Sequence, residues 1–443
     1  MIISWLFGIS LESSQFHALG TSKIKKLLTL ITLMIVGEAI FFLPFVITRV
    51  FRPTFLTVFE IDNLELGTAF SVYGIVAMAS YFFGGPIADR YSPKKLLIFS
   101  LIATALAGLI MAGIPSLTTL TILYGFWGLS TILFFWAAFI KGIRQFGGEE
   151  SQGKSQGLVD GGRGFVAALI ASSSVFLLDA LLPVSADQAT KNQLENGLSL
   201  IIIFFSILVL LTAVLVWKAL PSATLKTTEK AEKMSLSGVK KAISHRSVWL
   251  QAIILLCAYV GYKCTDDFGL YAQDAFGYDD VESAHIATIS FWMRPIAAAL
   301  AGFLGDKLVH SKITKACFVI LILGSMIISS GVLGGDIFLL IALTLASTSL
   351  GIYGLRGLYY ALFQESKIPL SYAGAAIGFI SVIGYTPDVF MGPLMGVLLD
   401  NNPGKLGHQY LFGVLAVFGV IGLLASVLFG KDSSVTGEES QSI

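Results

Sequence analysis

The sequence predicts an all-α membrane protein with twelve transmembrane helices in two pseudo-symmetric six-helix bundles. Composition is the first reason: 55% of the 443 residues are hydrophobic, only 13% are charged and the mean hydropathy is +0.81. A soluble domain carries about 25% charged residues. The apolar residues also fall in runs of about 20, the length that a helix needs to cross a hydrocarbon core. A short charged motif that occurs twice indicates two equivalent halves.

Hydropathy places the spans of the first bundle at 27–50, 64–86, 95–114, 118–143, 157–182 and 196–219. The spans of the second bundle are expected at 248–273, 282–305, 314–333, 336–361, 371–399 and 408–430. Only helices satisfy their backbone hydrogen bonds at this length, because a barrel strand needs about 10 residues. The expected domains are an N-terminal segment 1–26, a first bundle 27–219, a lysine-containing solvated linker 220–247, a second bundle 248–430 and a disordered Ser/Glu-rich tail 431–443.

Basic residues near the ends of the spans predict that both termini and the central linker lie in the cytoplasm. Lysine and arginine occur at 23–26, at 90–95, in the linker and at 307–315, which all fall on one side. The loops of the opposite side carry mainly Asp and Glu, at 60–65 and 274–282. The apolar start of the chain lacks a basic flank and a convincing cleavage site, so a removable signal peptide is not expected.

The repeated motif consists of a glycine, three residues, an acid and a base, at a turn between two predicted spans. Its copies are Gly85, Asp89 and Arg90, and Gly302, Asp306 and Lys307. The two glycines are 217 positions apart, and the similar segments that begin at 156 and 377 are 221 apart. This small difference indicates two copies of one six-helix unit with a few loop insertions.

The first copy resembles the signature of the major facilitator superfamily between helices 2 and 3, Gly-x-Leu-Ala-Asp-Arg-x-Gly-Arg-Lys. It matches at Gly85, Ile87, Ala88, Asp89, Arg90 and Lys94 and departs at Ser92 and Pro93. The second copy lies between predicted helices 8 and 9, as the family expects, so the resemblance covers essentially the whole chain. It implies a monomeric secondary active transporter of the bacterial inner membrane that works by alternating access.

In that family the motif is a cytoplasmic gate. The resemblance therefore implies gate roles for Gly85, Asp89, Arg90, Gly302, Asp306 and Lys307. The alternative is that these residues only shape a tight turn and keep the loop in the cytosol. Helix 4 has no basic residue in its body, and helix 5 lacks the Gly-Pro pair typical of drug/proton antiporters, which disfavours drug export.

Other functions lack their motifs. The sequence has no phosphate-binding Gly-x-x-x-x-Gly-Lys loop, so ATP-driven transport is not predicted. The five histidines are scattered, and the three cysteines lie in apolar runs, which predicts no disulfide, metal site or cofactor. A net charge of +1 gives no general attraction to nucleic acid. We therefore predict that the chain is not an enzyme and that its partners are a small solute, membrane lipid and a coupling ion.

Charges inside the spans are candidate functional residues, because an unpaired charge in a bilayer is costly. Glu38 lies midway along helix 1 and is interpreted as a proton-coupling or substrate-binding carboxylate, with a structural partner of a buried base as the alternative. Arg294 lies mid-helix before Pro295 and offers a planar fork suited to a carboxylate or phosphate. It is the favoured anion-binding residue, and Trp292 is expected to wall the same cavity.

Helix 7 carries Lys263, Asp266 and Asp267. Offsets of three and four place both acids on the face of the lysine. The favoured interpretation is an internal salt-bridge cluster near the outer end. The alternatives are an outer gate, or a lysine that binds an anion when its pair opens.

Three further positions complete the predicted site. Arg356 is interpreted as a second anion contact or a gate residue. Asp388, which follows Pro387 in a predicted helix break, is expected to pair with Arg294 or Arg356. Asp160 and Arg163 are interpreted as an inner-gate pair rather than a binding site.

The near balance of these buried bases and acids indicates ion pairs that open and close during transport. The leading hypothesis is a proton-coupled symporter of a small polar organic solute that is anionic or zwitterionic. The alternatives are an organophosphate/phosphate-type exchanger or a sodium-coupled carrier, and, from another class, a non-transporting membrane sensor on the same fold.

Overall fold

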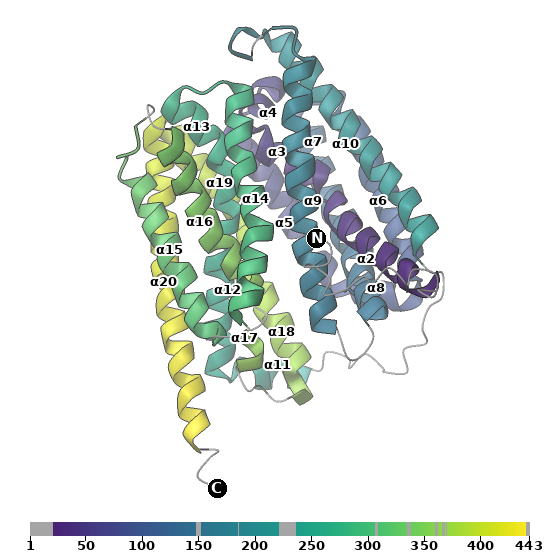
Figure 1. The fold of residues 1–443 in the computed structure, drawn as a ribbon, viewed down its shortest axis with the longest axis vertical. Helices are drawn as coiled ribbons and strands as arrows, with labels where there is room; N and C mark the ends of the chain where they lie inside the picture. The colour runs from purple at the N-terminus through teal and green to yellow at the C-terminus, as the bar shows by residue number, and fades with distance from the viewer. Residues whose placement is uncertain are drawn as a thin grey trace, which may run out of the picture.

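The computed structural model describes residues 21–147, 152–184, 186–220, 236–305, 309–334, 338–358, 362–365, 368 and 370–439. Every regular element in these ranges is a helix, and the helices form two bundles that stand side by side (Figure 1). Each bundle is formed by one half of the chain, as the colour gradient of Figure 1 shows. The all-α fold predicted from hydropathy is confirmed.

The helices of the first half are α2 (Thr21–Ala39), η1 (Phe42–Val46), α3 (Ile47–Val50), α4 (Arg52–Phe59), α5 (Asn63–Arg90), α6 (Pro93–Met111), α7 (Leu117–Gly128), η2 (Leu129–Trp136), α8 (Ala137–Gly147), α9 (Gln152–Leu181), η3 (Ala186–Gln188) and α10 (Lys191–Ala219). Those of the second half are α11 (Leu236–Ile243), α12 (Arg246–Cys264), η4 (Thr265–Asp267), α13 (Phe268–Phe276), α14 (Asp280–Gly305), α15 (His310–Ser329), α16 (Phe338–Leu358), α17 (Leu362–Glu365), α18 (Leu370–Gly384), α19 (Pro387–Asn401) and α20 (Lys405–Glu439).

The number of helices that can cross a membrane is close to the predicted twelve. Within the described ranges, ten helices are long and apolar enough, or eleven when the bent pair Leu27–Ala39 and Phe42–Val50 counts as one span. The range predicted as the eighth span forms α14, a helix of 26 residues. This helix carries Arg294 near its middle, among Ser, Thr and His residues.

Two spans of the first bundle contain π-helical turns, where the sequence predicts continuous helices. The first is η1, which includes Pro44 and begins just after the break at residues 40–41, where the segments Leu27–Ala39 and Phe42–Val50 meet at a bend of 44°. Proline has no amide hydrogen and disturbs the regular pattern of helix hydrogen bonds. The second is η2, between α7 and α8. π-Helical turns are rare and occur frequently at functional sites.

In the second half, the span predicted at 371–399 is divided into α18 and α19. Pro387 is the first residue of α19, a position where its missing amide hydrogen costs nothing. The helix break expected at this proline is therefore present. In contrast, α14 continues through Pro295.

Two segments outside the predicted spans are more helical than their composition indicates. The linker contains α11, which packs against α18 and buries Ala242 completely. A short amphipathic helix of this kind is stabilised by its tertiary contacts rather than by its length. The C-terminal helix α20 extends to Glu439, into the range predicted as a disordered tail. Residues 1–20, most of the predicted N-terminal segment, lie outside the described ranges.

Each half has its own hydrophobic core, and two helix pairs join the halves: α5 with α19, and α9 with α14. Glycines allow the first pair to approach closely. A Cβ atom added to Gly67 would lie 2.2 Å from the carbonyl oxygen of Gly392. Below, the end of the molecule where α5 begins is called the Asn63 end, and the end where α5 finishes is called the Arg90 end.

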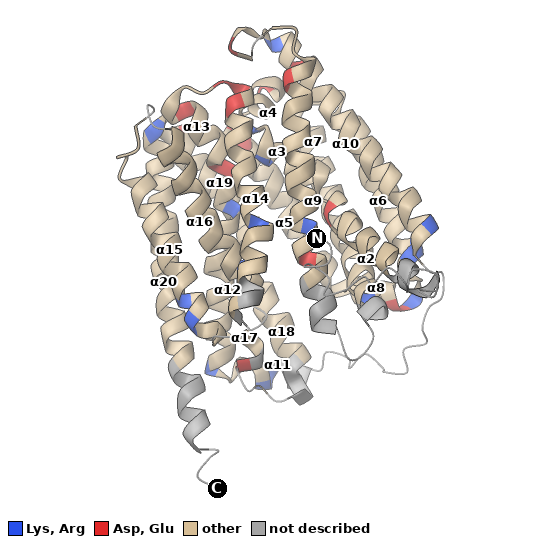
Figure 2. Ribbon diagram, viewed as in Figure 1, with Lys and Arg blue, Asp and Glu red and all other residues tan. Residues whose placement is uncertain are grey.

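Charged residues gather at the two ends of the helices, and at mid-height on the helices where the bundles meet (Figure 2). The outward faces of the spans are mostly uncharged, as expected for a surface in contact with lipid. The charges at mid-height therefore mark the region in which a functional site is expected.

Candidate functional site

A cavity lies between the two bundles, and both halves of the chain form its walls. It holds ≈ 900 Å³ of space that no atom fills, counting the part open to solvent. The charged residues that line it are Glu38, Arg49, Arg163, Lys263, Arg294, Arg356 and Asp388. Its aromatic lining includes Phe41, Phe45, Trp136, Tyr259, Tyr262 and Tyr385.

One group of charges, here called the Glu38 cluster, consists of Glu38, Asp160, Arg163 and Arg294. Arg294 Nη1 on α14 donates to Glu38 Oε1 on α2 at 2.9 Å, across the two halves. Arg163 Nε on α9 lies 3.3 Å from Glu38 Oε2. The Glu38 carboxylate therefore lies between two guanidinium groups, and all three side chains are buried.

Asp160 belongs to the same cluster. Its Oδ1 accepts from Arg163 Nη1 at 3.2 Å and lies 3.5 Å from Arg294 Nη2. The pairing predicted between Asp160 and Arg163 is present, but both residues also belong to a contact between the halves. Gly164 makes room for it: a Cβ at this position would lie 2.9 Å from Arg294 Cγ.

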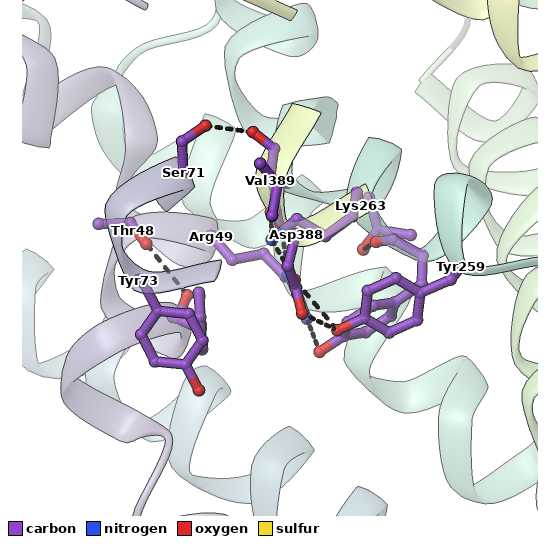
Figure 3. A network of polar contacts seen from close by, with 12 residues as sticks. Thr48, Arg49, Ser71, Tyr73, Tyr259, Lys263, Asp388 and Val389 are labelled. Carbon is purple, nitrogen blue, oxygen red and sulfur yellow. Dashed lines mark hydrogen bonds and ion pairs between the residues drawn. The ribbon is translucent and has the colours of Figure 1, made fainter. Parts of the chain in front are cut away.

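A second group of charges, here called the Lys263 cluster, consists of Arg49, Lys263, Asp266 and Asp388. Lys263 Nζ lies 3.6 Å from Asp266 Oδ2 and 3.5 Å from Asp388 Oδ1, so two carboxylates share one ammonium group. Arg49 on α3 crosses to the second half and donates to Asp266. Asp388 also accepts from the hydroxyl of Tyr259, at 3.0 Å and 3.1 Å (Figure 3). Arg49 is a charged residue of the cavity wall that sequence reasoning missed, although a base in an apolar span was a usable signal.

Of the two partners predicted for Asp388, Arg294 does not pair with it. Arg294 makes ion pairs with the two acids of the Glu38 cluster, and Asp388 makes an ion pair with Lys263. These partners lie far apart in the sequence. Their pairing depends on how the bundles pack, which a helix-by-helix reading cannot provide.

Asp267 is not on the face of Lys263, which corrects the prediction from helical spacing. The α-helix ends at Cys264, and residues 265–267 form a 3₁₀ turn. With three residues per turn, Asp266, three residues after Lys263, lies on the same side of the helix as Lys263. Asp267 lies on a different side. Its Oδ2 lies 2.7 Å from His408 Nδ1, and His408 Nε2 lies 3.1 Å from Asp274 Oδ2. His408, dismissed as isolated in the sequence, is thus held between two carboxylates.

An aromatic ring contacts two of the arginines that line the cavity. The guanidinium of Arg356 lies 4.2 Å from the ring centre of Tyr262, and that of Arg49 lies 4.5 Å from it. Such cation–π contacts stabilise a buried cation that has little water around it. Trp292 is not among the lining residues, in contrast to the prediction. Its indole N–H donates to Ser172 Oγ on α9 at 3.0 Å, so Trp292 belongs to the α9–α14 contact.

The two ends of α5 carry further polar contacts. At the Asn63 end, Asp400 of α19 accepts from the backbone N–H groups of Asn63 and Leu64, at 3.2 Å and 2.8 Å, across the halves. Outside the spans at this end, the Lys191 ammonium donates to Glu60 and holds the pKa of that carboxyl below its usual value.

At the Arg90 end, the motif residue Asp89 lies 3.3 Å from Lys141 Nζ of α8, in its own half. Arg90 follows it as the last residue of α5, and Gly85 lies one turn earlier in the same helix. Gly302 is in α14. The other two members of the second copy, Asp306 and Lys307, lie outside the described residues.

Two bundles of membrane-spanning helices around a charged cavity form the architecture of a solute carrier. The sequence pattern of the Major Facilitator Superfamily matches residues 28–390, and the chain belongs to this family. It is a multi-pass membrane transporter, and members of this class are carriers rather than enzymes.

The relatives agree with this assignment. The inner membrane protein YqcE of Escherichia coli K12 is 27% identical, over 84% of this chain and 87% of that protein. The inner membrane protein YihN of the same organism is 25% identical, over 86% of this chain and 90% of the relative.

Among solved structures, the nucleoside transporter NupG is similar with a TM-score of 0.69 and 12% identity, over 91% of this chain and 99% of the other. The D-xylose-proton symporter is similar with a TM-score of 0.69 and 13% identity, over 91% and 96%. At these identities the likeness concerns the fold. The solutes that these two carriers transport differ, so their likeness identifies no solute for this chain.

Proposed function

We propose that this protein transports a small polar organic solute, anionic or zwitterionic, by alternating access coupled to protons. The observation that carries the proposal is the cavity between the halves, whose charged groups make ion pairs across the halves. A hydrophobic drug would gain little from such groups, because removing them from water is costly. A polar solute can replace ionic partners that open during transport.

The proposal places the Arg90 end in the cytoplasm and the Asn63 end outside. The distribution of basic residues supports this orientation, because those near the Arg90 end include Arg90, Lys94 and Lys95. The contact of Asp400 with the start of α5 then closes the outer side. On this assignment the structure corresponds to a state whose cavity is closed to the outside.

The proposal is tested in liposomes that contain the purified protein. A pH gradient, acidic outside, is imposed while labelled organic anions, dipeptides and sugars are screened for uptake. We expect an anionic or zwitterionic compound to accumulate, and a protonophore to abolish its accumulation. Accumulation that follows a sodium gradient, or strict exchange with phosphate, would replace proton coupling by one of those mechanisms. A protein that moves no compound under any of these gradients would favour a non-transporting sensor.

A further inference from the structure

Glu38 and Asp388, one carboxylate from each charge cluster, differ in their ion pairs and in their exposure. Glu38 lies between the guanidinium groups of Arg163 and Arg294, and its side chain is 6% exposed. Asp388 makes its ion pair with Lys263, and its side chain is 16% exposed in the cavity wall. A proton on Glu38 would break two buried ion pairs and leave Asp160 as the acid that contacts both guanidinium groups, whereas a proton on Asp388 would break the one pair with Lys263.

Asp388 lies where a proton can be accommodated. The Lys263 cluster has two bases and two acids, and Asp266 already contacts both Arg49 and Lys263. Neutralising Asp388 therefore leaves Arg49 paired and gives the cluster one net positive charge, located near Lys263. A monoanion bound at Lys263 restores neutrality. Proton and anion then enter the cavity without adding net charge to it.

From this arrangement, and on the basis of the proposed function, we infer that Asp388 carries the coupling proton and that Lys263 binds the anionic group of the solute. A proton from the open side binds a carboxylate oxygen of Asp388, and the ion pair between Lys263 and Asp388 separates. The solute anion then takes the place of Asp388 on the ammonium group. On the other side the solute leaves, the proton is released and the ion pair forms again.

The position of Asp388 connects this exchange with movement of the bundles. Asp388 is the second residue of α19, next to the break that separates α18 from α19. A Cβ at Gly74 of α5 would lie 2.5 Å from the carbonyl oxygen of Asp388, so the backbone at this residue is packed on the other half. A change in the ion pair of Asp388 therefore acts directly on the α5–α19 contact.

The titration of Asp388 depends on the groups around it. From α12 these are Tyr259, which donates to it, Tyr262 and Lys263. Asp266 of η4 reaches it through Lys263, and Tyr73 of α5 and Arg356 of α16 line the same cavity. Tyr259 stabilises the ionised form by hydrogen bonding. Replacing Tyr259 by Phe should therefore allow Asp388 to take up its proton at higher pH.

Infrared spectroscopy of the purified full-length protein tests the proton site without any solute. Lowering the pH should increase the C=O stretching band of a protonated carboxylic acid. Exposed carboxylates add to this band at low pH, so the contribution of Asp388 is the difference between the wild-type protein and a variant. We expect D388N to lose one component of the band, D388E to keep it at a shifted position, E38Q to keep it unchanged, and Y259F to show it at higher pH. A band that persists in D388N and disappears in E38Q would assign the proton to Glu38 and overturn the inference.

Transport tests the same inference with a compound that the wild-type protein accumulates. One-to-one coupling to a pH difference of one unit supports about tenfold accumulation. In D388N we expect the accumulation ratio to fall from about tenfold to about onefold, while the variant still exchanges labelled for unlabelled compound. In K263Q we expect weaker binding of the compound. Gradient-driven accumulation that survives in D388N would overturn the inference but leave the proposed function intact. Absence of transport by the wild-type protein would instead remove the proposed function.

Discussion

The two ends of α5 differ in the half of the molecule that they contact. At the Asn63 end, Asp400 of the second half accepts hydrogen bonds from the start of the helix, and Gly67 packs on Gly392. At the Arg90 end, Asp89 pairs with Lys141 of the same half. One helix is thus fixed to the opposite half at its start and to its own half at its finish. Under alternating access, these two sets of contacts are expected to exchange roles as the cavity opens to the other side.

The largest effect is expected from a side chain inserted at the glycine contact. In G67V the new Cβ would lie 2.2 Å from the Gly392 carbonyl oxygen, so the helices must separate. Overpacking of about 1–3 kcal/mol corresponds to a shift of about 5–150-fold between the two states. Spin labels at Thr68 and Val397 should report longer distances, and transport should fall strongly. The matched control is G374V in α18, where an added Cβ would meet nothing within 4 Å. Unchanged distances in G67V would show that this contact does not control closure.

A smaller shift in the same direction is expected from D400N. The carboxylate accepts from two backbone N–H groups at the start of α5, and an anion at a helix N-terminus stabilises by about 0.3–1 kcal/mol. The population closed at the Asn63 end should therefore fall about two- to fivefold in the spin-label measurement. The control is D62N, because Asp62 caps the same helix from within its own half. If D62N shifts the distances as much as D400N, the effect comes from helix stability and not from contact between the halves.

The smallest effect in this state is expected from D89N. The Asp89 side chain is 61% exposed, and exposed ion pairs contribute about 0–1 kcal/mol. Thermal unfolding should therefore change little. If Asp89 bonds the second half when the cavity opens outward, D89N should weaken that state and shorten the distances at the Asn63 end, opposite to D400N. A shift in the same direction as D400N would contradict a gate role for Asp89.

The fold could be predicted from the sequence because a bilayer restricts the possibilities severely. Apolar runs of spanning length must be helices, and the repeated motif at Gly85 and Gly302 divides them into two halves. The breaks were harder to predict. Pro387 indicated one correctly, whereas η2 contains no proline that would mark it in the sequence. The burial of Ala242 on α11 also could not be predicted, because the linker around it is mostly polar.

The candidate site could be predicted in part, for a related reason. Charges such as Glu38, Arg294 and Asp388 stand out in apolar spans, and the structure places them in the wall of one cavity. Their partners did not follow from the sequence. Arg49 and Asp266 are 217 positions apart, and only the packing of the two bundles brings them together. Asp267 was misplaced because one 3₁₀ turn changes the direction of the next side chain.

The π-helical turns have a consequence for the evolution of this chain. Both η1 and η2 contribute residues to the cavity, including Phe45 and Trp136. A π-turn absorbs one extra residue in a helix, so an insertion or deletion between Glu38 and Arg49 that no such turn compensates would rotate one side of the helix against the other by about 100°. Glu38 and Arg49, which lie on opposite sides of η1, would then no longer face the same space. Insertions and deletions between these two positions should therefore be tolerated less than most substitutions, and the spacing of Glu38 and Arg49 is as much a part of the site as their identity.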